Sequence, residues 1–249
     1  MTAAAVVTVI CSVADNSFGL TVAVFILLFA SLLTLAVDSF RKRQSGRAFD
    51  FENAGGMKTV SYLCAAAFVA ETVSNVLKLY GYYTSDIIIK GRAVLLVFIA
   101  VTSLLSAFLF VLVAKSYGNT NYEFTRIPAL CFAPLVWSLV KTAQHLGDEL
   151  ITTNDISSVI KTVLITTLML FFYSFAAETK KVGTASAGTV FFSGAAFVTG
   201  ALYFVSRLAL CLAQRSEVVT FENAFSLTAL IIGVFALIFR NNIIKTTTV

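Results

Sequence analysis

One short stretch of this chain combines the residue types and the spacing that chemistry requires. Glu71 interrupts an apolar run and is followed at positions i+3 and i+4 by Ser74 and Asn75. Lys78 lies two helical turns beyond Glu71. On an α-helix these spacings bring the four side chains to one face. Such a stripe can hold a proton or a cation, or form half of a solute pocket; the alternative is a structural ion pair or interhelical hydrogen bond.

A second stripe follows in the fourth apolar run. Trp137, Lys141 and His145 are spaced i, i+4 and i+8, which predicts one helical face, and Gln144 lies beside them. His145 is the only histidine. It is either a pH-responsive group or an ordinary hydrogen-bonded residue near a helix end. Pro134 is predicted to kink this helix at mid-length.

Basic residues near the predicted outer ends of alternate runs complete the candidate site. Lys78, Lys141 and Arg207 occupy this position, and Arg207 is expected to close the sixth run. The recurrence suggests three repeated helical hairpins. The simpler explanation is that long basic side chains reach for lipid headgroups. The candidate intramembrane polar site comprises Glu71, Ser74, Asn75, Lys78, Trp137, Lys141, His145 and Arg207.

The sequence contains no motif typical of disulfide frameworks, metal sites or common enzyme classes. The four cysteines form no CxxC pair and have no histidine at metal-ligand spacing, so we expect no disulfide framework and no metal site. No Walker A, HExxH or GxSxG motif is present. We therefore expect a non-enzymatic protein with no catalytic residues and no cofactor.

The amino-acid composition indicates whether the segments that carry these residues are surrounded by water or by lipid. The 249 residues are 58% hydrophobic and only 12% charged, and the mean hydropathy is +0.89. Soluble domains carry about 25% charged residues. So few charges cannot cover a water-facing globule, which predicts a lipid bilayer as the main partner. The net charge of +5 is explained by topology and does not indicate nucleic acid.

Long unbroken apolar runs favour an all-α fold over a β-barrel, whose strands would alternate polar and apolar residues. We predict a polytopic transmembrane helical bundle in which residues 1–249 form a single membrane domain. Seven spans are predicted near residues 18–37, 59–79, 93–114, 127–145, 156–177, 184–206 and 222–240. The alternative is six spans, with the last and shortest run lying in the interface. Residues 1–14 are too short to span and are expected to form an interfacial or loosely packed segment outside the membrane; the alternative is an extension of the first helix. Small residues crowd 183–200, which predicts a closely packed helix.

The distribution of basic residues predicts the orientation. The loop between the first two runs is strongly basic and holds Arg41, Lys42, Arg43, Arg47 and Lys58. Basic loops stay in the cytoplasm. The N-terminus is therefore expected outside and the C-terminus in the cytoplasm.

From Pro134 onward the chain resembles a family of uncharacterised multi-span membrane proteins of Firmicutes. The resemblance rests on short motifs: Pro134-Leu-Val-Trp137, Asn154-Asp-Ile-Ser157, Leu170-Phe-Phe-Tyr-Ser-Phe-Ala176 and Ser206-Arg207. The chain departs from the family pattern at Ser158, where an acidic residue is expected, and at Ser206, where proline is expected. The resemblance implies a bacterial inner (plasma) membrane and adds no chemistry.

Three kinds of function remain compatible with the sequence. The first is a binding or transport module for a small solute, an ion or a lipid headgroup, because the membrane-embedded charges gather in the predicted outer half. The second is an accessory or structural protein that acts through a membrane-protein partner or a homo-oligomer. The third is a sensor that signals through the basic first loop, which serves equally well as a topology anchor.

Overall fold

The computed structural model of the protein describes residues 30, 32–34, 56–84, 90–117, 129–149, 156–178, 187–214 and 221–247. Its elements are α3 (Met57–Thr84), α4 (Lys90–Ser116), the 3₁₀ turn η2 (Leu130–Phe132), α5 (Ala133–Glu149), α6 (Ile156–Glu178), α7 (Ala187–Gln214) and α8 (Phe221–Thr247). The predicted all-α class is thus confirmed for the described part of the chain. Residues 30 and 32–34 are helical, whereas segment 1–14 and most of the predicted span 18–37 lie outside the described residues.

Five of these helices are long and apolar enough to cross a membrane. They correspond to the predicted spans near 59–79, 93–114, 156–177, 184–206 and 222–240. Their candidate spanning segments are Met57–Thr84, Gly91–Ser116, Ser158–Glu178, Ala187–Leu208 and Glu222–Asn242. Length and composition therefore identify a membrane-embedded helical protein.

The fourth predicted span differs from the structure at both ends. Residues 127 and 128 lie outside the described part, the turn η2 precedes the helix, and α5 continues past residue 145 to Glu149. Pro134 is the second residue of α5, so the predicted kink at mid-helix is wrong. Proline is tolerated in a first helical turn because the amide hydrogen that it lacks would have no acceptor there.

The helix that carries the sixth predicted span also ends later than expected. Arg207 was predicted to close this helix, but α7 continues to Gln214, about two turns further. Arg207 is half-buried and lies within the helix. A basic side chain does not stop an α-helix, since arginine is a good helix former.

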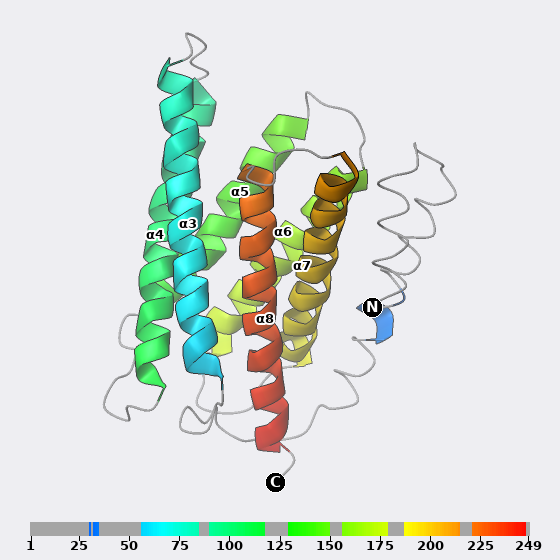
Figure 1. Ribbon diagram of the computed structural model, residues 1–249. Coiled ribbons are helices and arrows are strands. Elements are labelled where there is room, and N and C mark those ends of the chain that lie inside the picture. The colour runs from blue at the N-terminus through cyan, green and yellow to red at the C-terminus, as the bar shows by residue number, and fades with distance from the viewer. Residues whose placement is uncertain are drawn as a thin grey trace.

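The helices pack as a bundle in which neighbours in sequence are mostly neighbours in space. Helix α3 packs against α4 and α8, α5 lies between α4 and α6, and α7 packs between α6 and α8. Figure 1 shows α3 and α4 as a pair at one edge that reaches beyond the start of α8. Lys78 of α3 interacts electrostatically with Glu222 at the start of α8.

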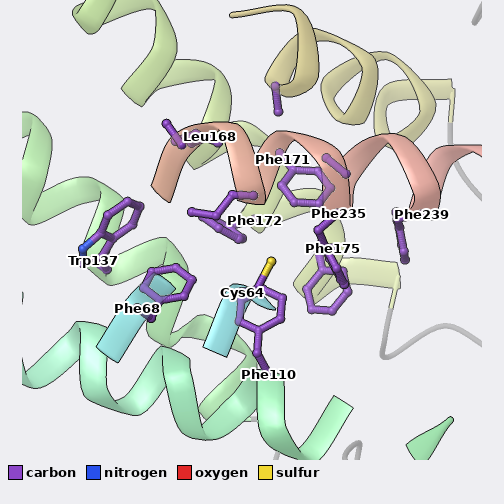
Figure 2. Packing of buried hydrophobic residues seen from close by; sticks show 14 of the residues in the cluster. Cys64, Phe68, Phe110, Trp137, Leu168, Phe171, Phe172, Phe175, Phe235 and Phe239 are labelled. Carbon is purple, nitrogen blue, oxygen red and sulfur yellow. The ribbon is translucent and has the colours of Figure 1, made fainter. Parts of the chain in front are cut away.

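Aromatic side chains fill the interior of the bundle (Figure 2). Phe68 stacks on Phe110 at 5.6 Å between ring centroids and meets the edge of Trp137 at 5.0 Å. Further along, Phe171, Phe172, Phe175, Phe235 and Phe239 continue the cluster. Aromatic pairs in these geometries contribute about 0.5–1.5 kcal/mol beyond their buried area. Eight phenylalanines of the described residues thus belong to the core.

The outward faces are also apolar, as expected of helices in lipid. Val73 on α3 and Phe98 and Leu104 on α4 are 53%, 55% and 56% exposed. In water an apolar surface of this extent would be an aggregation site. In a bilayer these side chains contact acyl chains.

Helices α7 and α8 cross at two glycines. A Cβ at Gly200 would lie 2.8 Å from the carbonyl oxygen of Ala229, and one at Gly233 would lie 3.0 Å from Cα of Phe197. Both obstacles are backbone atoms. The close approach predicted from the small residues of 183–200 is therefore found at Gly200, and it depends on glycine on both helices.

Candidate functional site

Glu71 lies in the bundle interior because it continues the buried face of α3. Cys64 and Phe68 precede it at helical spacing, and Ser74 and Asn75 follow on the same face; all five are buried. The amide nitrogen of Asn75 lies 3.0 Å from Glu71 Oε1 and 2.6 Å from the Glu71 carbonyl oxygen, and it donates to both. Asn75 thereby orients the carboxylate toward the neighbouring helices.

The two polar stripes meet at a buried ion pair. Lys141 Nζ lies 2.5 Å from Glu71 Oε1, and the two side chains are 8% and 1% exposed. Trp137, Lys141 and His145, which their i, i+4, i+8 spacing places on one helical face, are all buried. The pair joins α3 to α5, although these helices are not close neighbours in the bundle.

A second ion pair lies closer to the end of the bundle. Lys161 Nζ of α6 is 3.1 Å from each carboxylate oxygen of Glu222 on α8. The hydroxyl of Tyr203 on α7 donates to Glu222 Oε2 at 3.0 Å. This group ties the start of α6, the start of α8 and the later part of α7 together.

Phe225 of α8 connects the two pairs. The Nζ atoms of Lys141 and Lys161 lie 5.0 and 5.9 Å from the centre of its ring. Tyr203 and Trp137 pack against the same ring at 5.9 and 6.3 Å. A ring face attracts ammonium groups within about 6 Å. Both ammonium groups therefore lie within reach of the Phe225 ring.

Exposure falls steadily from the end of the bundle inward. The side chain of Glu222 is 40% exposed and that of Lys161 21%, whereas those of Lys141 and Glu71 are 8% and 1% exposed. Beyond Glu71 lie the packed aromatic rings of Phe68, Trp137 and Phe172, whose centroids are 5.0–6.4 Å apart (Figure 2). The pair near the start of α8 is thus more exposed than the inner pair, and aromatic packing lies beyond Glu71.

The remaining candidates lie around this group in different ways. Lys78 interacts electrostatically with Glu71, Lys141, Lys161 and Glu222. Ser74 is buried on the face of α3 that carries Glu71. His145 is directed to α6 instead: its Nε2 lies 3.0 Å from Thr162 Oγ1 and 3.1 Å from the carbonyl oxygen of Ser158.

Arg207 lies one turn after Tyr203 on α7 and interacts with it electrostatically. Its Nε atom is buried and finds no hydrogen-bond acceptor among the described residues. Arg207 therefore flanks the pair of Lys161 and Glu222 and forms no ion pair with a described carboxylate.

Three buried polar atoms beside the inner pair also lack partners in the described part of the chain: Glu71 Oε2, Asn75 Oδ1 and Trp137 Nε1. Buried polar atoms without a hydrogen bond are rare and costly. The free carboxylate oxygen of Glu71 is an acceptor in a low-dielectric interior.

Sequence reasoning missed Lys161, Tyr203, Glu222 and Phe225. Lys161 and Glu222 occur in the first turns of apolar runs, where polar residues are ordinarily interfacial ends. The signal in the sequence that could have identified them is that both are charged and lie at the same predicted end of two helices. No three His, Cys, Asp or Glu side chains converge among the described residues, so the group has no metal-ligand set there.

No protein-family model, curated protein or solved structure matches this chain.

Proposed function

We propose that this chain is a multi-pass membrane protein with seven spans, an external N-terminus and a cytoplasmic C-terminus. Five candidate spans support this proposal. The turn η2 and α5 together run from Leu130 to Glu149, about 30 Å and long enough for a sixth crossing. Residues 18–37 supply the seventh. The basic loop of Arg41–Arg47 supports the orientation, and the resemblance to Firmicutes proteins supports a bacterial plasma membrane.

Within that bilayer the protein acts as a binding or transport module linked to a proton at Glu71. The observation that carries this proposal is the presence of two ion pairs that differ in exposure, with packed aromatic rings beyond the inner one. Charged residues inside spanning helices are expensive and mark ion and substrate pathways. An apolar replacement for a buried ion pair is often equally stable, so packing alone does not require one.

The geometry supports a specific sequence of events. A proton that enters from the outer end binds Glu71 Oε2, the oxygen without a donor. Neutral Glu71 attracts Lys141 much less. The ammonium of Lys141 already lies 5.0 Å from the Phe225 ring, and it then moves toward Glu222. Lys78, Lys161, Tyr203 and Arg207 are the other ionisable groups around this path.

Proton binding at Glu71 moves charge within the protein, and this can be measured without knowing the solute. In proteoliposomes on a solid-supported membrane electrode, a jump of external pH should evoke a transient charge displacement. We expect Glu71→Gln to reduce it to the level of protein-free membranes. Glu178→Gln should retain it, because Glu178 lies at the far end of α6 and bonds to Thr189 there.

The double variant Glu71→Gln/Lys141→Met controls for loss of folding in the single variant, because it removes both charges of the buried pair. It should fold and should also lack the displacement. A displacement of full size in both Glu71 variants would contradict the proposal. No displacement in the folded wild-type protein would favour the accessory or structural role, with the ion pairs as fasteners between helices.

A further inference from the structure

The carboxyl group of Glu71 and the side-chain amide of Asn75 share one hydrogen bond where their shapes allow two. The amide nitrogen Nδ2 of Asn75 donates to Glu71 Oε1 at 3.0 Å. Glu71 Oε2 and Asn75 Oδ1 are buried and have no hydrogen-bond partner among the described residues. Both of these atoms are acceptors while the carboxyl group is ionised, so they cannot bond to each other in that state. A single proton would supply the donor that both lack.

A protonated carboxyl group and a side-chain amide are complementary. Each then offers a donor and an acceptor from one carbon, so the two groups can join through two parallel hydrogen bonds. The first bond, from Asn75 Nδ2 to Glu71 Oε1, is already present. The second would run from the Oε2 hydroxyl of neutral Glu71 to Asn75 Oδ1. The terminal torsions of glutamate and asparagine side chains have broad minima, so small rotations are enough to align these atoms.

Asn75 is held in place for this second bond by its own helix. Its Nδ2 also donates to the carbonyl oxygen of Glu71 at 2.6 Å, so Oδ1 is the atom of the amide that remains to accept. Side chains at i and i+4 of a helix are neighbours, and this arrangement therefore does not depend on a second helix. On the carboxyl group, Lys141 also binds Oε1. Oε2 is thus the oxygen of Glu71 that is left to take a proton.

We propose that Asn75 is a positioning residue for the proton on Glu71: in the neutral state Oε2–H donates to Asn75 Oδ1 while Nδ2 donates to Oε1. This inference rests on the proposed function and deepens it by naming the group that holds the proton. The proton comes from the outer solution, and only an O–H bond is formed. The new hydrogen bond satisfies two buried oxygens at once, which offsets part of the weakened ion pair. The other ionisable side chains around this pair are Lys78 on α3, Lys141 and His145 on α5, Lys161 on α6, Arg207 on α7 and Glu222 on α8.

Infrared difference spectroscopy of the reconstituted protein across a step of external pH detects this pair directly. The carbonyl stretch of a carboxylic acid falls to lower wavenumber when its carbonyl accepts a hydrogen bond and its hydroxyl donates one. We expect Asn75→Leu, which has a similar size and no amide, to keep the band of protonated Glu71 and to move it to higher wavenumber. Asn75→Gln retains an amide at the same helical spacing and should restore most of the wild-type position. Ser61→Ala is the matched control and should leave the band in place, because Ser61 is buried on the same helix and donates to the Met57 carbonyl oxygen, away from the pair.

A second measurement uses the wild-type chain and does not depend on the folding of an Asn75 variant. With the side-chain carbonyl of asparagine isotopically labelled, the amide carbonyl stretch of Asn75 should move to lower wavenumber when Glu71 is protonated, because Oδ1 gains a donor. Glu71→Gln should abolish this change. The inference is overturned if the labelled carbonyl does not respond while the Glu71 band is present, or if Asn75→Leu leaves that band at its wild-type position. Either result would leave the proposed function standing, whereas the absence of any Glu71 band in the wild type would remove both.

Discussion

Lys141→Met should destabilise the protein by about 3–5 kcal/mol, because it leaves the carboxylate of Glu71 buried without its partner. Methionine keeps the length of the lysine side chain, so that packing against Phe225 changes little. Equilibrium unfolding in mixed detergent micelles measures the loss. The matched control is Lys115→Met, since Lys115 is exposed on α4 and its replacement should change stability by less than about 0.5 kcal/mol.

The double variant Lys141→Met/Glu71→Leu shows whether the pair acts as a unit. Removing both charges should recover most of the loss, with a coupling free energy of about 2 kcal/mol or more. Strictly additive effects would mean that Glu71 and Lys141 do not interact in the bilayer. That result would remove the geometry on which the proton pathway depends.

Gly200→Ala and Gly233→Ala should each destabilise the protein by about 1–3 kcal/mol, because the new methyl group overpacks the crossing of α7 and α8. The nearest atoms would be 2.8 and 3.0 Å away and belong to the backbone, so a side-chain rotation cannot relieve the clash. The same unfolding measurement applies.

Gly81→Ala on α3 is a control for which we expect no loss of stability. Nothing lies within 4 Å of a Cβ at that position, and alanine is a better helix former than glycine by up to about 1 kcal/mol. This variant should be neutral or more stable than the wild type. If Gly200→Ala and Gly233→Ala behaved like Gly81→Ala, the helices would not cross as closely as the structure describes.

The all-α fold was predictable because the composition leaves no other way to satisfy the backbone in lipid. Helical spacing also predicted which residues share a face, and the structure shows that Glu71, Asn75, Trp137 and Lys141 are all buried. The spacing within one helix carries no information about which helix lies opposite. That Glu71 meets Lys141 of α5, with Phe225 of α8 beside them, therefore came only from the tertiary structure.

The errors have local causes. Pro134 was placed at mid-helix because the apolar run extends on both sides of it, whereas α5 starts only at Ala133. Lys161 and Glu222 were left out of the candidate site, because a polar residue in the first turns of an apolar run ordinarily faces headgroups. Sixty-one positions separate them in sequence, and only the packing of α6 and α8 around α7 brings them together. The number of spans, the orientation and the resemblance to Firmicutes proteins stay predictions.

The central claim is that Glu71 exchanges a proton with the outer solution. Infrared difference spectroscopy of the reconstituted protein across a step of external pH detects this exchange as the carbonyl stretch of a newly protonated carboxylic acid. The account predicts a band that shifts in heavy water, disappears in Glu71→Gln and persists in Glu178→Gln. A spectrum with no such band, or with one that Glu71→Gln leaves intact, would contradict it and identify the ion pair with Lys141 as a permanent link between helices.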